Sequence, residues 1–441
     1  MSSASMGRRK RVITGLVAGA GAATLLLSAC TSPGGSDTGG DAATEFSFLS
    51  QVESPFARDE LSRLAENECS AENEALPLVN ETMPQADVVT RISLLASQDE
   101  LPVMFPAPTA QIKPGGDLAD GGLIVDYEEV LTELGVIDNI LPGAISAIKN
   151  SYGGRMSSIP FQYNIEGIFY NKEIFAANGL EIPETIDELT AAAETLSGAG
   201  VQPFSVAGQD GWPATRWISS YLFRDLGADA IQKVVDGEAS FNDPEYLPAV
   251  ELIAEYGANG WFGPGVGSID YDTATTQFLT GQSAMMYMGT WLLSNINNPE
   301  LNTVGAENIG FMPFPAVEGG AGSIDQFPAN AGTGIAMSQK LYGPKVGDWL
   351  SCITENFGSG ILESQGAISG FKINTPVDDV PALTAEIQGL MADSTESLLW
   401  FETLFDEKTG DFAQFNVAQV LTGSMSPADY LAGVQSSLDQ R

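Results

Sequence analysis

Histidine and cysteine, on which many catalytic and zinc sites depend, are scarce in this chain of 441 residues. It contains no histidine, which excludes Ser-His-Asp and Cys-His nucleophilic sites, histidine-ligated zinc and histidine acid–base chemistry. Its three cysteines, Cys30, Cys69 and Cys352, are too few for an all-cysteine zinc site. Aspartate and glutamate number 57, but no pair stands out as the two carboxylates of a glycoside hydrolase. These residue types therefore exclude several classes of catalytic site, and we expect no cofactor and no metal.

The first thirty residues have the three zones of a secretory signal peptide. Basic residues 8–11 precede an apolar stretch from Val12 to Leu27. That stretch of roughly 16 residues is shorter than the run of about 20 that spans a membrane. The four residues ending at Cys30 resemble the lipobox of bacterial lipoproteins, which implies a leader at 1–29 and a lipid on Cys30. An ordinary secreted protein with an incidental Cys30 is the alternative.

The chain after Cys30 begins with a Gly- and Ser-rich segment, and we expect residues 30–43 to be a flexible, lipidated tether. We therefore expect the protein on the outer face of the bacterial cell membrane. Removing residues 1–29 takes away four of the 19 basic residues and no acidic one, which leaves a net charge near −42. Such a surface repels phosphate backbones and anionic headgroups, so we expect no nucleic-acid partner.

Strand-like and helix-like segments alternate through most of the chain. We expect strands at 45–49, 101–105, 167–170 and 284–288, and helices at 56–68, 126–134 and 273–280. Thr185 and Glu188 have the spacing of a capping box, which predicts a helix that ends near Gly198 and Gly200. This alternation predicts an α/β fold with largely parallel sheets, in which ligands bind outside the carboxyl ends of strands. Trp291, just after the last of these strands, then lies near a candidate site.

Three stretches together resemble the family 1 extracellular solute-binding proteins, the group that includes maltose-binding protein. They are Ile168–Phe175, Phe278–Trp291 and Asn330–Ser338. The resemblance implies the type II periplasmic-binding-protein fold, with two α/β lobes, a hinge and a ligand cleft between the lobes. It maps lobe 1 to residues 44–165 and 312–372, lobe 2 to 166–311, and the C-terminal helices at 373–441 mainly to lobe 2.

The two cysteines that follow the tether, Cys69 and Cys352, pair as one disulfide in an oxidising exterior or stay as two buried thiols. The mapping implied by the family places both in lobe 1. This favours the disulfide, because a bridge within one lobe does not oppose movement of the lobes.

A neutral sugar, the ligand that the resemblance implies, needs aromatic platforms for its C–H faces and polar groups for its hydroxyls. Trp291 is the first candidate platform, since it matches the family's stacking tryptophan; a core-filling indole is the alternative. Trp212 lies in a turn that the family often uses at the cleft. Asn164 aligns with a sugar-contacting acid of maltose-binding protein and departs from it as an amide. The other candidates are Gln51, Glu53, Thr109, Tyr163, Asp210, Asn330, Phe371 and Trp400.

The resemblance implies a monomer that captures a mono- or oligosaccharide by hinge closure and delivers it to the permease subunits of an ABC importer. Three alternatives stay open. The first is a binding protein for a peptide, a polyol or a phosphate ester. The second is a glycoside hydrolase, and the third is a structural lipoprotein without a closing cleft.

Overall fold

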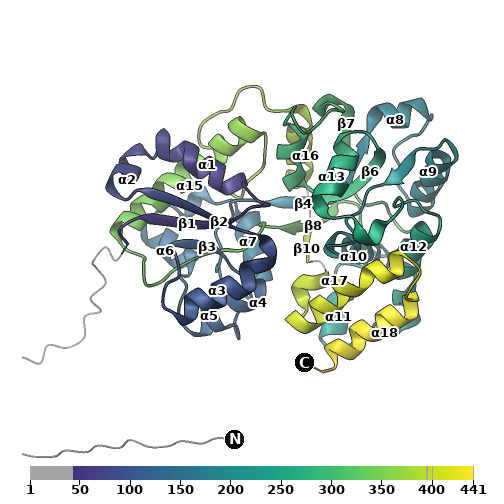
Figure 1. Cartoon of the computed structure of the whole chain (residues 1–441), viewed down its shortest axis with the longest axis horizontal. Coiled ribbons are helices and arrows are strands. Elements are labelled where there is room, and N and C mark those ends of the chain that lie inside the picture. Colours follow the sequence, from purple (N-terminus) through teal and green to yellow (C-terminus); the bar gives the residue numbers. More distant parts are fainter. Residues whose placement is uncertain (1–42, 394–395, 400, 441) are drawn as a thin grey trace, which may run out of the picture. The chain divides into compact units, whose positions relative to one another are not determined.

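The computed structural model describes residues 43–393, 396–399 and 401–440. The predicted signal peptide, Cys30, the tether up to residue 42 and Trp400 lie outside the described residues. The described chain forms two lobes, each built on its own sheet and its own hydrophobic core (Figure 1). The α/β architecture predicted from the alternating segments is confirmed.

The first lobe is built on a sheet with strand order β2-β1-β3-β9. Its strands are β1 (Phe46–Gln51), β2 (Leu78–Met83), β3 (Met104–Pro106) and β9 (Ile335–Met337). β1 runs parallel to β2 and β3, whereas β9 runs antiparallel to β3. Its helices are α1 (Phe56–Glu66), α2 (Ser70–Ala75), α3 (Val88–Ser97), α4 (Thr109–Ile112), α5 (Asp117–Asp120), α6 (Tyr127–Glu133), α7 (Pro142–Ser151) and α15 (Pro344–Gln365). Short 3₁₀ turns lie at Gln85–Asp87 and Ile137–Asn139.

The second lobe is built on a sheet with strand order β10-β8-β4-β6-β5, and β7 also pairs with β4. Its strands are β4 (Asn164–Asn171), β5 (Gln202–Phe204), β6 (Ser283–Gly289), β7 (Ile309–Met312), β8 (Gln326–Asn330) and β10 (Glu396–Leu398). Its helices are α8 (Lys172–Ala177), α9 (Ile186–Gly198), α10 (Trp212–Leu226), α11 (Ala230–Val235), α12 (Leu247–Ala258), α13 (Tyr271–Leu279), α14 (Leu293–Ile296), α16 (Ala382–Asp393), α17 (Glu407–Leu421) and α18 (Pro427–Leu438). Its 3₁₀ turns are Pro244–Tyr246, Val266–Ser268, Thr290–Leu292, Ala306–Asn308 and Phe401–Leu404.

The prediction of largely parallel sheets was wrong for this second sheet. Strand β4 runs antiparallel to β6, β7 and β8, and the parallel pairs are β5 with β6 and β8 with β10. The physical reason is the route of the chain. β4 is the strand by which the chain enters the second lobe, and β8 is the strand by which it leaves, so the two run in opposite directions.

The second crossing between the lobes lies later than the family mapping placed it. The core of the first lobe draws on residues 43–161 and 331–371, whereas the core of the second lobe includes Phe327 and Ala329. β8 pairs with β4 and β10, so residues 312–330 belong to the second lobe rather than to the first. The boundary predicted at residue 312 therefore moves to Ala331.

Helix α9 begins with the predicted capping box. The backbone N–H of Glu188 donates to Thr185 Oγ1 at 3.2 Å, and the N–H of Thr185 donates to Glu188 Oε2 at 3.2 Å. These two bonds satisfy donors that the first turn of a helix leaves free. The capping box and the end of the helix at Gly198 are both as predicted.

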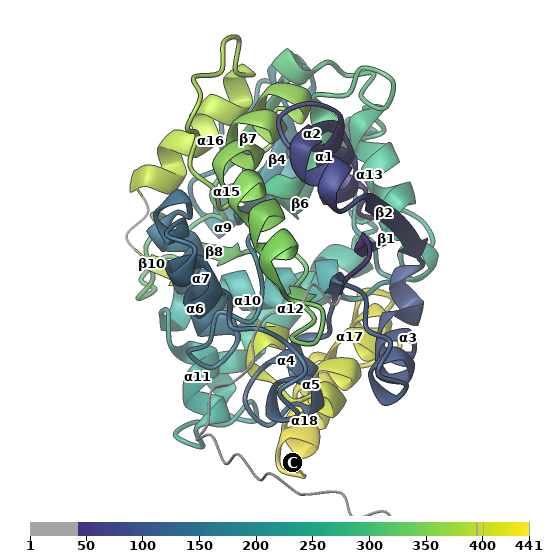
Figure 2. The same cartoon turned by 90° about the vertical axis from the view of Figure 1, so that its left-hand side faces the viewer.

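A disulfide joins the two cysteines of the first lobe. Cys69 precedes α2 and Cys352 lies in α15, and their Cα atoms are 5.8 Å apart. Helix α15 packs against α1 and α2 (Figure 2), and Trp349 Nε1 donates to the carbonyl oxygen of Leu76 at 2.8 Å. The bridge thus ties together helices of one lobe.

Candidate functional site

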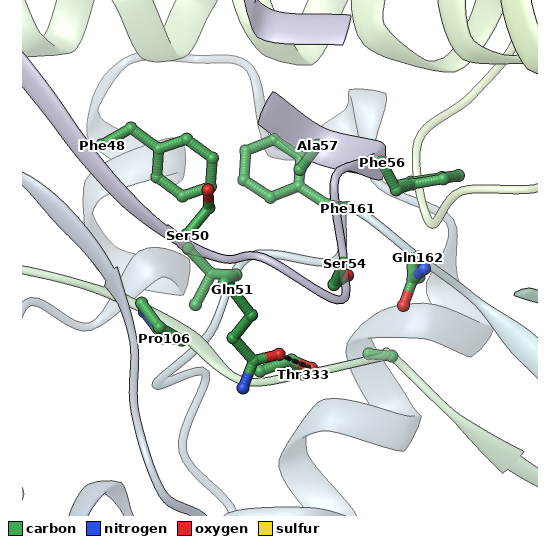
Figure 3. Close-up of a pocket in the computed structure, with 12 residues that line it drawn as sticks. Phe48, Ser50, Gln51, Ser54, Phe56, Ala57, Pro106, Phe161, Gln162 and Thr333 are labelled. Atoms are coloured by element: carbon green, nitrogen blue, oxygen red, sulfur yellow. Dashed lines mark hydrogen bonds between the residues drawn. The ribbon is translucent and has the colours of Figure 1, made fainter. Parts of the chain in front are cut away.

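A pocket in the first lobe places polar side chains beside aromatic rings (Figure 3). The space between its walls is about 370 Å³, which includes solvent at its open side. It is lined by Phe48, Ser50, Gln51, Ser54, Phe56, Ala57, Pro106, Phe161, Gln162, Ala331, Thr333 and Ile335. β1 and β3 contribute their carboxyl ends, as expected for the ligand edge of a parallel sheet. None of the described residues that line the pocket carries a charge, so it suits a neutral polar ligand.

The predicted residue Gln51 belongs to this pocket. It is the last residue of β1 and is 7% exposed. Thr333 Oγ1 donates to Gln51 Oε1 at 3.4 Å, which joins the two sides of the pocket (Figure 3). Amide and hydroxyl groups held in this way can both donate and accept hydrogen bonds, as the binding of hydroxyl groups requires.

Three aromatic residues of the second lobe form a second candidate surface. The ring centroids of Trp212 and Trp291 are 5.9 Å apart, and those of Trp212 and Tyr271 are also 5.9 Å apart. All three side chains are half-buried. Desolvation of its hydroxyl raises the pKa of Tyr271 to about 12, although hydrogen bonds with Trp291 and Thr275 act in the opposite direction. We call Trp212, Tyr271 and Trp291 the aromatic cluster.

Two glycines determine where the tryptophans of this cluster lie. Gly211 precedes Trp212 with φ of 74°, a conformation that favours glycine, and a Cβ there would collide with the backbone of Gln414 in α17. Gly289 ends β6, and the indole of Trp291 fills the space that a Cβ of Gly289 would need. The Trp291 ring can approach the backbone closely only because Gly289 lacks a side chain, and the turn before Trp212 can pack on α17 only because Gly211 lacks one.

The carboxylates of Glu53 and Asp210 come from different lobes. Glu53 is exposed, and its Oε2 accepts a hydrogen bond from the N–H of Gln85 at 3.0 Å. Asp210 Oδ2 accepts a hydrogen bond from the N–H of Tyr271 at 2.6 Å. Burial raises the pKa of Asp210, and the negative charges of Asp270, Asp272 and Glu53 raise it further. Glu53 of the first lobe thus lies near enough to Asp210 of the second for its charge to act on that carboxyl.

Asn164 and Asn330 lie in a buried network and not on an open surface. They are 1% and 6% exposed. Asn164 Nδ2 donates to Asn330 Oδ1 at 3.2 Å, and Asn164 Oδ1 accepts from Thr290 Oγ1 at 3.2 Å. Their amides are thus occupied by protein partners where the chain crosses between the lobes.

Three other predicted residues lie apart from the pocket lining. Tyr163 packs against core clusters of both lobes, at the first crossing. Thr109 is the first residue of α4 and hydrogen-bonds with Tyr152, whose pKa burial raises to about 12. Phe371 is 2% exposed and packs against Phe161 and Phe357, with ring centroids 6.0 and 5.2 Å apart. Phe371 therefore fills the core of the first lobe instead of forming a wall of the pocket, because its ring completes a buried aromatic group.

The sequence interpretation missed several residues that the fold brings to these surfaces. Ser50 and Ser54 lie beside the predicted Gln51, Gln162 precedes Tyr163, and Thr333 lies within the stretch from Asn330 to Ser338. Their nearness to predicted residues was a usable signal. Nothing local distinguishes Tyr271, because it joins the tryptophans only through the packing of α13.

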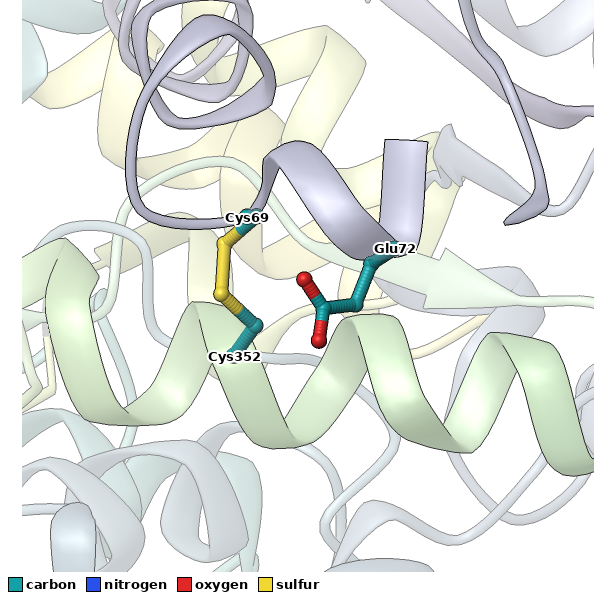
Figure 4. A group of neighbouring side chains, drawn as sticks. All are labelled: Cys69, Glu72 and Cys352. Carbon is teal, nitrogen blue, oxygen red and sulfur yellow. A yellow bond between two sulfur atoms is a disulfide. The ribbon is translucent and has the colours of Figure 1, made fainter. Parts of the chain in front are cut away.

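One group of neighbouring side chains in the described part of the chain has the composition of a metal site. It consists of Cys69, Glu72 and Cys352 (Figure 4). The two sulfur atoms are bonded to each other, so neither is a thiolate, the form that binds metal. The donor set therefore does not fit a metal ion.

Among the residues that the structure describes, we find no helix with the length and apolar character that crossing a membrane requires.

Two curated proteins resemble parts of this chain. An uncharacterized ABC transporter extracellular-binding protein of Pyrococcus horikoshii is 35% identical over 126 residues, which are 28% of each chain. The alpha-glucosides-binding periplasmic protein of Rhizobium meliloti is 28% identical over 162 residues, which are 34% of each chain. The matched segments thus span about a third or less of these relatives' own length.

Solved structures match the fold over nearly all of their length. A protein from work on xylan utilization by Caldanaerobius polysaccharolyticus superposes with a TM-score of 0.78 at 20% identity, covering 89% of this chain and 99% of that one. This likeness agrees with the two-lobe fold described above.

The family model described as bacterial extracellular solute-binding protein matches residues 82–342, more than half of the chain. The matched range includes the end of β2, the entry strand β4, the aromatic cluster and β9. By this match, and by the two-lobe fold, the chain belongs to the bacterial extracellular solute-binding protein family.

Proposed function

We propose that this protein captures a neutral sugar between its lobes and delivers it to the permease subunits of an ABC importer. The observation that carries the proposal is that each lobe offers one of the two kinds of surface that a sugar needs. The aromatic cluster in the second lobe offers ring faces, and the pocket in the first lobe offers uncharged hydroxyl and amide groups. A sugar needs both kinds of surface, because its C–H faces are apolar and its rim carries hydroxyls.

The charges around these surfaces disfavour an anionic ligand. Asp210 and Glu53 contribute negative charge from both lobes. Arg216, which lies beside Trp212, is already paired with Glu166 at 3.2 Å, and Arg155 of the first lobe is paired with Asp126 at 3.4 Å. A phosphate ester would need unpaired cations, so a neutral ligand is the better match.

The relatives support a carbohydrate ligand for this chain. One is named for alpha-glucosides and another comes from work on xylan utilization. Both names refer to sugars linked through glycosidic bonds, so we propose an oligosaccharide and keep monosaccharides in the test. The family is one of binding proteins, and we propose that the ligand is released unchanged.

The mechanism that we propose is closure about the strands that join the lobes. A sugar that contacts both lobes stabilises the closed state more than the open state, and this difference in affinity drives closure. The closed form then docks on the importer. A lipid on Cys30 would keep a monomeric protein at the outer face of the membrane, where the permease lies.

The experiment that tests the proposal is thermal unfolding of residues 31–441 with a panel of mono- and oligosaccharides, followed by calorimetry of each hit. A ligand at 100 times its Kd stabilises the native state by about 2.7 kcal/mol. We expect a shift with one group of sugars and its loss in Trp291→Ala. Phe415→Ala is the matched control, because Phe415 is an exposed aromatic residue of the same lobe outside the aromatic cluster. A shift with peptides, polyols or phosphate esters, and none with sugars, would overturn the ligand assignment.

A further inference from the structure

Arg216 links the aromatic cluster to the interior of the second lobe. It lies four residues after Trp212 on α10, a spacing that places both side chains on one face of the helix. The guanidinium carbon is 5.5 Å from the centroid of the Trp212 ring. A guanidinium at this distance from an indole is attracted to the ring. Trp212 is the first residue of α10, so no preceding turn of the helix packs against its ring. The contact with Arg216 therefore restrains the ring.

Arg216 is itself held by a buried carboxylate. Its Nη1 donates to Glu166 Oε1 at 3.2 Å, and the two side chains are 10% and 1% exposed. The second oxygen, Glu166 Oε2, accepts a hydrogen bond from the hydroxyl of Tyr287 at 3.3 Å. A buried ion pair adds little stability compared with apolar residues of the same size, because both ions lose their hydration. A role in orienting neighbouring groups therefore explains the pair better than stability does.

Glu166 in turn contacts Asn330, which lies in one of the three segments by which the chain crosses between the lobes. Asn330 Nδ2 donates to Glu166 Oε1 at 3.4 Å. Asn330 Oδ1 accepts from Asn164 Nδ2 at 3.2 Å and from the N–H of Gly332 at 2.7 Å. Asn164 belongs to the first crossing, and Asn330 and Gly332 to the second. The carboxylate is thus connected to the first two of the three crossings through one amide side chain; the third crossing leads from α15 in the first lobe to α16 in the second.

The same strand also connects to the other tryptophan. Glu166 stands opposite Gly289 in the register of β4 and β6, and the ring of Trp291 lies against Gly289. The hydroxyl of Thr290, next to Trp291, accepts from the N–H of Ile165 at 3.3 Å and donates to Asn164 at 3.2 Å. Both tryptophans of the aromatic cluster therefore adjoin one buried polar network.

Building on the proposed function, we propose that Arg216 is a positioning residue that orients Trp212 for the sugar, and that Glu166 holds Arg216 while it contacts the crossing strands. Arg216 does not touch the ligand in this scheme. It acts through the ring of Trp212, and Glu166 makes the orientation of that ring depend on the arrangement of the first two crossings.

The test is a double-mutant cycle between Trp212 and the ion pair. Arg216→Met alone would leave a buried carboxylate without its cation, so the pair is removed as Arg216→Met with Glu166→Gln. Calorimetry with maltose, xylobiose and raffinose then compares wild type, the pair variant, Trp212→Leu and the triple variant. We expect the pair variant to bind about fivefold to tenfold more weakly than wild type. The triple variant should bind as tightly as Trp212→Leu. Equal losses with and without Trp212 would overturn the proposal.

Arg224→Met is the matched control for the loss of a buried arginine. Arg224 lies on the same helix, is 1% exposed and donates to the carbonyl oxygens of Phe314 and Gln326 at 2.9 and 3.0 Å. We expect it to lower the unfolding temperature and to leave sugar affinity within about twofold of wild type. A loss of affinity equal to that of the pair variant would show a general packing effect and contradict the proposal.

A second measurement requires no ligand and separates this proposal from the proposed function. Acrylamide quenching of tryptophan fluorescence should increase in the pair variant, because the Trp212 ring is no longer restrained. The increase should be absent in the Trp212→Leu background. If no sugar binds to wild type but quenching behaves in this way, the ligand assignment fails and the positioning role stands. If sugars bind and quenching is unchanged by the pair variant, the positioning role fails alone.

Discussion

Asn164 and Asn330 stand opposite each other in adjacent antiparallel strands, and Nδ2 of the first donates to Oδ1 of the second at 3.2 Å. They are 166 residues apart in the chain. Each lies where the chain passes from one lobe to the other. These are the first two of three crossings, and the buried amides keep them in register, so a movement of the lobes must be accommodated in part at or beside this pair.

Gly332→Ala tests the second crossing as a hinge. Gly332 has φ of 75°, and the Gln162 side chain occupies the space of a Cβ there. We expect a loss of about 1 kcal/mol of stability from the strained backbone. We also expect incomplete closure, seen by small-angle scattering as a smaller decrease in the radius of gyration when sugar is added.

The matched control for that variant is Gly423→Ala. Gly423 has φ of 72° with nothing within 4 Å of a Cβ, and lies just after α17, away from the crossings. It should lose similar stability while closure and affinity stay as in wild type. Normal closure in Gly332→Ala would argue against a hinge at this position.

Gly289→Ala tests the support of the Trp291 platform without changing the tryptophan itself. The added methyl group needs space that the indole occupies, so the ring must move. Loss of one stacking platform should weaken sugar binding by about tenfold. Calorimetry measures the affinity, and near-ultraviolet circular dichroism reports the changed ring environment.

Gly198→Ala serves as its control, because a Cβ at Gly198 has no neighbour within 4 Å. That variant should bind sugar like wild type and be slightly more stable, since alanine favours helix more than glycine does. Unchanged affinity in Gly289→Ala would mean that the ligand does not rely on Trp291.

Asp210→Asn tests the carboxylate at the aromatic cluster through its pH dependence. Burial, and then the nearby negative charges, raise the pKa of Asp210 above its ordinary value of 3.8. A raised pKa means that ionisation costs more in the folded state than in the unfolded state, so the cost is present above the folded pKa. We expect the variant to be more stable than wild type at pH 7 and equally stable below pH 3.8.

Thermal unfolding of both proteins at pH 3.5 and pH 7 measures this difference. Asp270→Asn is the contrasting variant, because hydrogen bonds from Thr273 lower the pKa of Asp270. Its carboxylate contributes stability above the ordinary pKa that is lost as the pH falls through the folded value, so the variant should lose stability at pH 7. The same sign for both variants would contradict the environments described.

Removal of the disulfide should affect stability and leave binding unchanged. The bridge closes a loop between residues 283 positions apart, and Cys69→Ser with Cys352→Ser should lower the free energy of unfolding by about 2–4 kcal/mol. Both residues lie in the first lobe, so sugar affinity and closure should stay as in wild type. Urea unfolding and calorimetry test the two halves of the prediction, and weaker binding by the folded variant would contradict the second half.

Residues with strong local signals could be placed from the sequence. The capping box of Thr185 and Glu188, the helix end at Gly198 and the strand before Trp291 lie as predicted. These features depend on hydrogen bonds and side-chain periods within a few residues. The position of Trp291 just after a strand is an equally local signal, and it indicates one member of the aromatic cluster.

Residues whose role depends on distant partners could not be placed in this way. Phe371 is a candidate for the sugar site from its position after Gly370, but it completes a buried aromatic group with Phe161 and Phe357. The mapping implied by the family places the Gln326–Asn330 strand in the first lobe, whereas its hydrogen bonds to β4 hold it in the second. No local pattern distinguishes these alternatives.

The sequence by itself determined the class of protein: an α/β chain without histidine, with a leader-like start and with tryptophans at element ends. Only the tertiary structure decided which residues act together. Arg216 and Glu166 are 50 residues apart, and Gln51 and Thr333 are 282 apart. Such pairs follow from strand register and helix packing. A shift of one residue in a strand would turn each of its side chains to the opposite face, and no single segment encodes that choice.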